Sequence, residues 1–164
     1  MEGLAEFCRV EHPRLVGLLS LYCRDRRIAE ELAQDTMIRV ISDWSRVREL
    51  DSPSGWAYRV AINLANSYFR RRLAEHRATR RIPPGTIKHE PDTSTALAVR
   101  QAVASLPQRE RAVVVLRFFA DLSVREVSVL LGYPEGTVKT LTARALVALH
   151  RSGLNEIEEV TDGR

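Results

Sequence analysis

The chain has 164 residues and a mass of 18.6 kDa, which corresponds to one domain of ordinary size or to two small ones. Apolar residues make up 45% and charged residues 28%, the net charge is +4 and the pI is about 9.5, so the composition is that of a globular protein with a packed core. Only two cysteines, no apolar run near ~18 residues and no basic-then-apolar start argue against a disulfide scaffold, a membrane span and a secretory signal.

Along the chain, apolar residues recur at intervals of three and four, and strictly alternating β-branched runs are missing, which predicts an all-α protein. The first predicted helix covers residues 4–22, and Pro13 should kink it or mark a late start. A second helix, capped by Asp25, is predicted to end near residue 44. A third covers residues 52–73, with a serine as its cap and a proline at its first position.

The segment after the third helix interrupts this pattern with three prolines and one glycine, and Pro83-Pro84-Gly85 cannot continue a helix. It also overlaps a basic block, since residues 70–89 carry seven basic side chains and one acidic one. We interpret it as a flexible linker between two small helical domains. The predicted parts are a first domain (1–73), a linker (74–95), a second domain (96–153) with helices at about 94–105, 107–119, 123–131 and 134–150, and an acidic tail (154–164).

The last two of these helices predict a helix-turn-helix. Ser123 and Glu126 form the S-x-x-E capping box of its first helix, and Gly132 stands where a left-handed residue ends that helix. One face of its second helix is small, hydroxylated or basic, without an acid, and such a face can enter the major groove of DNA. A helical hairpin with a solvated face is the alternative. The face consists of Thr137, Lys139, Thr140, Ala143 and Arg144.

The third predicted helix has no Asp or Glu between residues 52 and 74. A donor-rich face without acids, next to aromatic residues, suits single-stranded or melting DNA, because bases stack on the rings and phosphates need neutralising. A basic face without a ligand is the alternative. The apolar arc is predicted to hold Trp56, Ala57, Val60, Ala61, Leu64, Ala65, Tyr68 and Phe69, and the opposite arc Arg59, Asn63, Asn66, Ser67 and Arg70.

The polar arc of the second predicted helix carries one apolar residue, Ile38, among Glu31, Gln34 and Asp35. An apolar residue ringed by polar ones is a candidate protein-docking centre. From the pattern alone, a solvated face with one exposed Ile is the simpler interpretation. The apolar arc of this helix is predicted to hold Ile28, Ala29, Leu32, Ala33, Met37, Val40, Ile41 and Trp44.

No constellation of residues predicts catalysis or a cofactor. Cys8, His12 and Cys23 could supply three metal ligands, but buried thiols are the simpler interpretation. The other histidines have no nucleophile or carboxylate in a recurring arrangement near them. We therefore predict neither an enzyme nor a metal or cofactor site.

Three segments, in this order, resemble a bacterial RNA polymerase sigma factor of the extracytoplasmic-function type, over about residues 4–152. The first, RDRRIAEELAQDTMIRVISDW, resembles region 2.2 of that family. The second, SPSGWAYRVAINLANSYFRRR, resembles regions 2.3–2.4, and the third, LPQRERAVVVLRFFADLSVREVSVLLGYPEGTVKTLTARAL, resembles region 4. The sequence EGTVK alone also occurs in response-regulator DNA-binding domains, so the order of the three segments makes the resemblance specific.

The resemblance implies a cytoplasmic sigma factor of two helical domains that binds core RNA polymerase and promoter DNA, without catalysis of its own and without membrane insertion. Its polymerase partners would be the clamp helices of the largest subunit and the flap region, and an anti-sigma factor is a further candidate partner. In the family the second helix docks on the clamp helices, which reverses the solvated-face interpretation. The core-binding residues would be Glu31, Gln34, Asp35 and Ile38.

The resemblance also implies which residues contact DNA. The loop at residues 45–51 and the third helix would bind and open the −10 element through Arg46, Val47, Arg48, Trp56, Arg59, Asn63, Ser67, Arg70 and Arg71. The helix-turn-helix would read the −35 element through Arg125, Thr137, Lys139, Thr140 and Arg144. The last helix departs from the common TVKSRLHRA, because Leu141 replaces a basic residue and Thr142 an apolar one, so its reading of the −35 element is expected to differ.

The alternative function is a stand-alone helix-turn-helix regulator whose N-terminal half senses a ligand or a partner. Such a regulator would bind specific duplex DNA without polymerase, whereas a sigma factor gains specificity in the holoenzyme. The acid-free third helix favours the sigma factor, because a sensor domain has no need of it.

Overall fold

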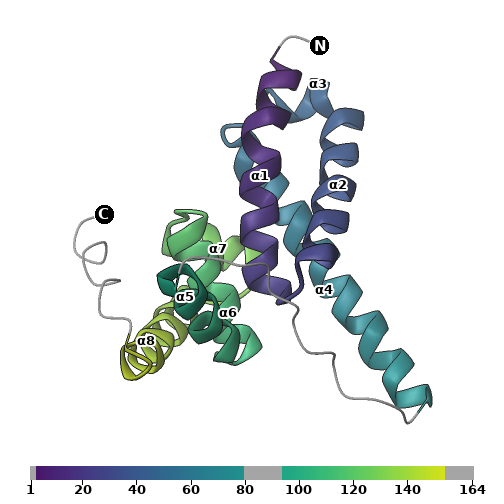
Figure 1. Ribbon diagram of the computed structural model, residues 1–164. Helices are drawn as coiled ribbons and strands as arrows, with labels where there is room; N and C mark the ends of the chain where they lie inside the picture. Colours follow the sequence, from purple (N-terminus) through teal and green to yellow (C-terminus); the bar gives the residue numbers. More distant parts are fainter. Residues whose placement is uncertain (1–2, 80–93, 154–164) are drawn as a thin grey trace. The chain divides into compact units, whose positions relative to one another are not determined.

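The computed structural model describes residues 3–79 and 94–153, with side chains at 3–75, 77 and 97–153. Over these ranges every regular element is a helix, as the sequence predicts. The chain forms two compact units, residues 1–88 and 89–164 (Figure 1). The predicted acidic tail and residues 80–93 of the predicted linker lie outside the described residues.

Unit 1 consists of α1 (Leu4–Cys23), α2 (Arg26–Ser42), the short α3 (Trp44–Val47) and the long α4 (Pro53–Thr79). Helices α1 and α2 pack against each other, and α4 packs against both (Figure 1). The core between them contains the fully buried side chains of Leu15, Leu19, Val40, Val47 and Ile62. Removing this apolar surface from water is the main stabilising contribution to the bundle.

Local signals set the first helix boundaries. Arg24 takes a left-handed conformation with φ 61° and ends α1, while its backbone N–H donates to the carbonyl of Ser20. The carboxylate of Asp25 accepts a hydrogen bond from the backbone N–H of Ile28 at 3.2 Å. The predicted cap of α2 is therefore confirmed, because that acceptor satisfies one of the four free N–H groups of the first turn.

Helix α1 runs through Pro13, so a late start at this proline is wrong. A proline inside a helix leaves the carbonyl four residues earlier without its usual donor. The proline is exposed, whereas Leu15, Leu18 and Leu19 on the same helix are buried. We attribute the continuity of α1 to the packing of this apolar face, which outweighs the lost hydrogen bond.

Two helix ends differ from the prediction. Helix α2 ends at Ser42, and Trp44 begins the separate α3, where its ring lies 5.2 Å from the ring of Phe7. Helix α4 continues to Thr79, so residues 74–79 are helical, whereas the sequence predicts a linker from residue 74. No proline or glycine stands between residues 56 and 82, and nothing local therefore stops the helix at residue 73.

Unit 2 consists of α5 (Ser94–Ser105), α6 (Gln108–Val114), the π-helical turn η1 (Val115–Phe119), α7 (Val124–Leu131) and α8 (Glu135–Arg151). Helix α8 packs against α6 and α7. The buried guanidinium of Arg111 donates to the carbonyls of Ala104 and Leu106 at 3.1 and 3.3 Å, which ties α6 to the end of α5. The core includes Val103, Val113, Leu116, Val127 and Leu149.

The helix-turn-helix of α7 and α8 has the predicted caps. The hydroxyl of Ser123 accepts from the N–H of Glu126, and the Glu126 carboxylate accepts from the N–H of Ser123 at 2.7 Å, so the capping box is complete. Gly132 ends α7 in a left-handed conformation with φ 70°. The side of α8 opposite the predicted DNA-binding face is buried through Val138, Leu141, Ala145 and Leu149, and Thr142 is buried beside it with its hydroxyl donating to the carbonyl of Val138.

The capping box leads to a stability prediction. Hydrogen bonds from Ser123 lower the pKa of Glu126, so this contribution to stability is present above the ordinary glutamate pKa and is lost as the pH falls through the lowered value. We expect Ser123→Ala to lower the free energy of unfolding by ~1 kcal/mol at pH 7, and by less at pH 3. Urea unfolding followed by circular dichroism measures both. Ser152→Ala, at the exposed end of α8, is the control, and an equal loss at both pH values would contradict the prediction.

Candidate nucleic-acid interface

The outer face of α4 is basic and amide-rich. Arg59, Asn63, Arg70 and Arg71 are exposed, and Ser67, whose hydroxyl accepts from Arg70 at 3.1 Å, is half-buried. The first acidic residue of the helix follows only at position 75. This face can therefore neutralise phosphates and offer hydrogen-bond donors to bases without repelling the DNA backbone.

Trp56 lies on a different side of α4 than its predicted place in the apolar arc. Periodicity places it in the apolar arc, but it is half-buried, and Tyr58 and Ile62 take the buried positions. At 100° per residue, a tryptophan at 56 points to nearly the same side as Asn63, seven residues on. The guanidinium of Arg46 lies 5.7 Å from the Trp56 ring, so the tryptophan joins α3 to the basic face.

The predicted loop at residues 45–51 is partly helical, and one of its predicted DNA contacts is wrong. Val47 is fully buried in α3, because it faces the core of unit 1, and its side chain is not available to DNA. Arg46 and Arg48 are exposed. Both are paired locally, Arg46 with Asp43 at 3.0 Å and Arg48 with Glu49 at 2.9 Å. Exposed pairs of this kind are weak, and DNA phosphates can replace their acidic partners.

Asn66 also departs from the prediction. Its side-chain oxygen accepts a hydrogen bond of 2.6 Å from the hydroxyl of Tyr22 on α1. Asn66 is half-buried at the edge of the packed side of α4 rather than at the centre of the polar arc. This residue therefore links α4 to α1.

The outer surface of α2 carries two exposed isoleucines. Ile38 is 60% exposed, as predicted, and Ile41 is 52% exposed, although periodicity places it in the apolar arc. The core takes Thr36 instead, whose hydroxyl donates to the carbonyl of Leu32 and is thereby satisfied within the helix. We call Ile38 and Ile41, with the exposed residues Glu31, Gln34 and Asp35, the α2 surface.

The charges on the α2 surface are unevenly paired. Glu31 pairs with Arg27 at 3.0 Å. Among the described residues, Asp35 has no ion-pair partner, and Gln34 lies exposed close to it on the helix. An apolar centre flanked by polar groups has the usual composition of a protein interface.

The exposed side of α8 keeps its cations available. Lys139 and Arg144 are exposed and have no ion pair within the described ranges 3–79 and 94–153. The hydroxyl of Thr140 donates to the carbonyl of Gly136, and Thr137 is half-buried. Arg125, on α7, is exposed. These positions agree with the orientation that the sequence predicts for a groove-binding helix.

One contact near α8 has no counterpart among the sequence predictions. The exposed Arg109 places its guanidinium 4.5 Å from the ring of Tyr133, in the turn that precedes α8. Tyr133 is fixed further by its carbonyl, which accepts from the hydroxyl of Ser128 at 2.5 Å. No local pattern marks this pair, because the two residues are 24 positions apart.

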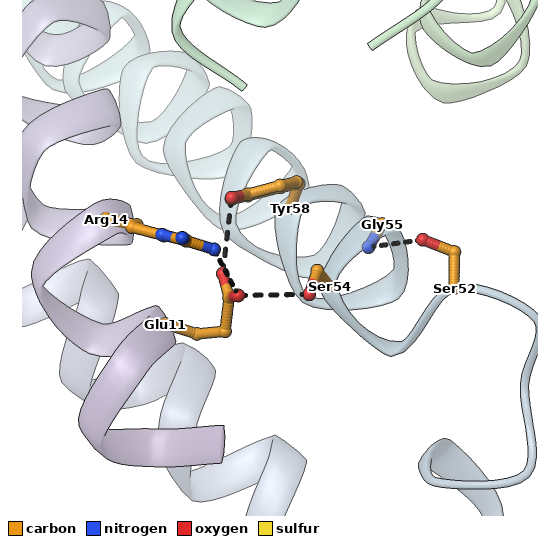
Figure 2. A network of polar contacts seen from close by, with 6 residues as sticks. All are labelled: Glu11, Arg14, Ser52, Ser54, Gly55 and Tyr58. Carbon is orange, nitrogen blue, oxygen red and sulfur yellow. Dashed lines mark hydrogen bonds and ion pairs between the residues drawn. The ribbon is translucent and has the colours of Figure 1, made fainter. Parts of the chain in front are cut away.

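Figure 2 shows a buried acid that no sequence pattern marks either. Glu11, on α1, is 4% exposed, and its carboxylate accepts hydrogen bonds from Ser54 at 3.1 Å, from Tyr58 at 3.2 Å and from Arg14 at 3.1 Å. Burial, and then the negative charge of Glu11, raises the pKa of Tyr58 to about 12. Ser54 and Tyr58 belong to the first turns of α4, so the acid joins α1 to the start of the basic helix.

Three further features of the described residues concern metal ligands, the state of the cysteines and membrane-spanning helices. Within the described ranges, no group of three or more His, Cys, Asp or Glu side chains could hold a metal ion. Cys23 is buried, and Cys8 is half-buried, with a thiol pKa that burial raises. In the same part of the chain, no helix combines the length and the apolar content that crossing a membrane requires.

Fold and surfaces together define a class: an all-α, two-unit DNA-binding protein with a helix-turn-helix. The family described as Sigma-70 region 2 matches residues 8–74, and the family described as Sigma-70, region 4 matches residues 96–149. The chain therefore belongs to the sigma-70 family of RNA polymerase sigma factors, in its extracytoplasmic-function (ECF) type. As a sigma factor, it binds core RNA polymerase and directs promoter recognition and transcription initiation.

Individual relatives agree with this assignment. The ECF RNA polymerase sigma factor SigM of Mycobacterium tuberculosis is 30% identical over 143 residues, which cover 87% of this chain and 73% of that protein. The ECF RNA polymerase sigma factor RpoE of Cereibacter sphaeroides is 30% identical over 164 residues, with coverages of 91% and 85%.

The fold also agrees with a solved structure. The sigma factor RpoE from Bartonella quintana, solved in complex with the anti-sigma factor NepR, matches 95% of this chain and 99% of its own with a TM-score of 0.85 and 17% identity. At that identity, the likeness concerns the fold.

Proposed function

We propose that the two units divide promoter recognition between them. Unit 1 docks on core polymerase through the α2 surface and binds the melting −10 element through α3, the turn after it and the outer face of α4. Unit 2 binds the −35 element as duplex DNA through α8. Catalysis remains with the polymerase, and this chain supplies contacts only.

The main support for this proposal is the outer face of α4. A helix that is merely solvated normally mixes both charges on its surface, but here Arg59, Asn63 and Arg70 share a face on which no acid precedes residue 75. Trp56 stands at the end of that face with a ring that can stack on an unpaired base. A duplex-binding regulator has no use for such a surface on a second unit.

The −35 contacts are assigned by chemistry. Lys139 and Arg144 can meet phosphates or guanine edges, and Thr140 and Thr137 allow close approach to the groove. Arg125, at the start of α7, lies where the first helix of such a motif crosses the backbone. Leu141 is buried, so position 141 faces the core of unit 2 and not the DNA side of α8.

An anti-sigma factor is a further proposed partner. The Bartonella quintana sigma factor, which shares this fold, was solved with one bound to it. For this chain, the exposed isoleucines of the α2 surface supply the kind of apolar centre that such a partner would cover.

Run-off transcription from a genomic promoter library tests the proposed function. We expect core polymerase to initiate at a restricted set of promoters only when this chain is present. The free chain should bind the same promoters weakly. Specific duplex binding without polymerase, and no gain in transcription with it, would instead identify the stand-alone regulator.

A further inference from the structure

Glu11 is a buried acid on α1, outside the proposed DNA-binding surfaces. We propose that Glu11 is a positioning residue for −10 recognition: its carboxylate holds the first turns of α4, and with them Trp56 and the turn that enters α4, in the orientation that reads the melted strand. This inference depends on the proposed function of that surface. It assigns a residue of α1 a part in −10 recognition, and this residue acts through the first turns of α4 and does not itself contact DNA.

The location of the negative charge has a physical reason. The positive end of a helix is stabilised by an acid near its first turn. Helix α4 has no acidic residue in its first turn. Glu11 provides the acid from α1, on the buried side of the helix, where it contacts Ser54 and Tyr58 (Figure 2).

The entry to α4 is fixed from both sides. Outside the helix, the hydroxyl of Ser52 accepts from the N–H of Gly55 at 3.0 Å and caps the first turn. A Cβ on Gly55 would lie 2.7 Å from that hydroxyl, so the cap needs glycine at this position. On the inner side, Glu11 accepts from Ser54, one residue before Gly55. The turn is therefore held between a cap and a buried carboxylate.

The same turn carries the residues that face the DNA. Trp56 follows Gly55 directly, and its ring is the contact of Arg46 in α3. The residues between α3 and α4, 48–52, end at the capped turn. A shift of the first turn of α4 would thus move the stacking ring and the entering loop together, whereas Arg70, more than three helical turns on, would move little.

Stability alone does not explain an acid here. Burying a carboxylate has a desolvation cost, and apolar residues of similar volume often stabilise such a site equally well or better. The carboxylate instead fixes directions, because one group accepts three donors from two helices. The expected consequence of losing it is a less defined −10 surface as well as a less stable one.

The experiment measures −10 selectivity in holoenzyme. A promoter identified by run-off transcription is prepared with its −10 positions randomised, and initiating sequences are counted for wild type, Glu11→Gln and Tyr58→Phe. Measurements are made well below the melting temperature of each variant. We expect both variants to lower the preference for the best −10 sequence about fivefold to tenfold, the size of effect that follows from losing one typical intramolecular hydrogen bond. Binding to core polymerase and to −35 duplex should stay at the wild-type level.

A matched control separates positioning from general stability. Leu19 lies on the same helix as Glu11, about 12 Å away along the helix axis, and Leu19→Ala leaves a cavity in the core of unit 1. This variant should lower the melting temperature without changing −10 selectivity. Equal loss of selectivity in Leu19→Ala would reduce Glu11 to a structural residue and overturn the inference.

Asn63→Ala is measured in parallel, because it tests the proposed −10 surface itself. If Asn63→Ala alters selectivity and the Glu11 and Tyr58 variants do not, the inference is wrong and the proposed function stands. If none of the three variants alters selectivity, both are wrong. A change in the Glu11 and Tyr58 variants alone would uphold the inference and remove Asn63 from the reading surface.

Discussion

We expect replacement of Ile38 by Arg together with Asp35 by Arg to weaken binding to core RNA polymerase by more than ~2 kcal/mol, or roughly thirtyfold in the dissociation constant. The apolar centre of the α2 surface is then replaced by a charge that must be desolvated on docking, and the unpaired acid of Asp35 changes sign. Both side chains are exposed and point away from the core of unit 1, so the fold should stay intact. Titration of labelled core polymerase with each chain measures the effect.

Leu73→Arg is the matched control for this prediction. Leu73 belongs to the same unit and is 53% exposed, close to the 60% of Ile38, but it lies on α4. The control adds a positive charge to an exposed apolar position without touching the α2 surface. It should bind core polymerase as wild type does. A double variant of Ile38 and Asp35 that still captures core polymerase at wild-type affinity would show that another surface docks.

The sequence predicts the features that local chemistry determines. Asp25, Ser123 and Gly132 act within a few residues of themselves, and each helix boundary that they mark lies where the pattern places it. The sequence predicts the exposed side of α8 equally well, because an amphipathic helix buries its apolar stripe and leaves its polar side exposed to solvent. Ile38 is predicted to be exposed for the same reason.

The sequence predictions are wrong for residues whose burial depends on how a neighbouring helix packs. Ile41 and Trp56 are apolar residues near helix ends, and periodicity assigns both to the core, but the neighbouring helices cover Thr36 and Tyr58 instead. Val47 lies in a helix of four residues, too short to show a period of 3.6, and only the tertiary fold reveals that it is buried.

Glu11 is the clearest limit of sequence reasoning. It reads as an ordinary surface acid, three residues before an arginine on the same helix. Its other partners, Ser54 and Tyr58, are 43 and 47 positions away. No periodicity or spacing connects them, because the contact depends on how α1 packs against α4. A positioning residue of this kind becomes visible only in three dimensions.

The second large effect separates the two DNA-binding modes. Lys139→Ala with Arg144→Ala should weaken capture of the −35 element by ~1–3 kcal/mol for each side chain that binds a base edge in the wild type. For each side chain that binds a phosphate instead, the log–log salt slope should fall by about 0.9 on duplex DNA. Asn63→Ala should impair opening of the −10 element, because it removes a donor from the face that binds the melting strand. Holoenzyme is titrated on one promoter in two forms, fully paired and with the −10 segment unpaired by mismatches.

The two forms of the promoter decide the assignment. The −35 element is duplex in both, so the weaker capture by the Lys139 and Arg144 variant should persist on the mismatched form. Asn63→Ala should be rescued there, and permanganate reactivity of the paired form should show less opening before the rescue. Arg151→Ala removes one positive charge from the exposed last turn of α8 and should behave as wild type, since it lies far from the start of the helix. A mismatched promoter that rescues Lys139→Ala and leaves Asn63→Ala impaired would contradict the division between the two units, because the side chains of α8, rather than Asn63, would then act in opening the −10 element.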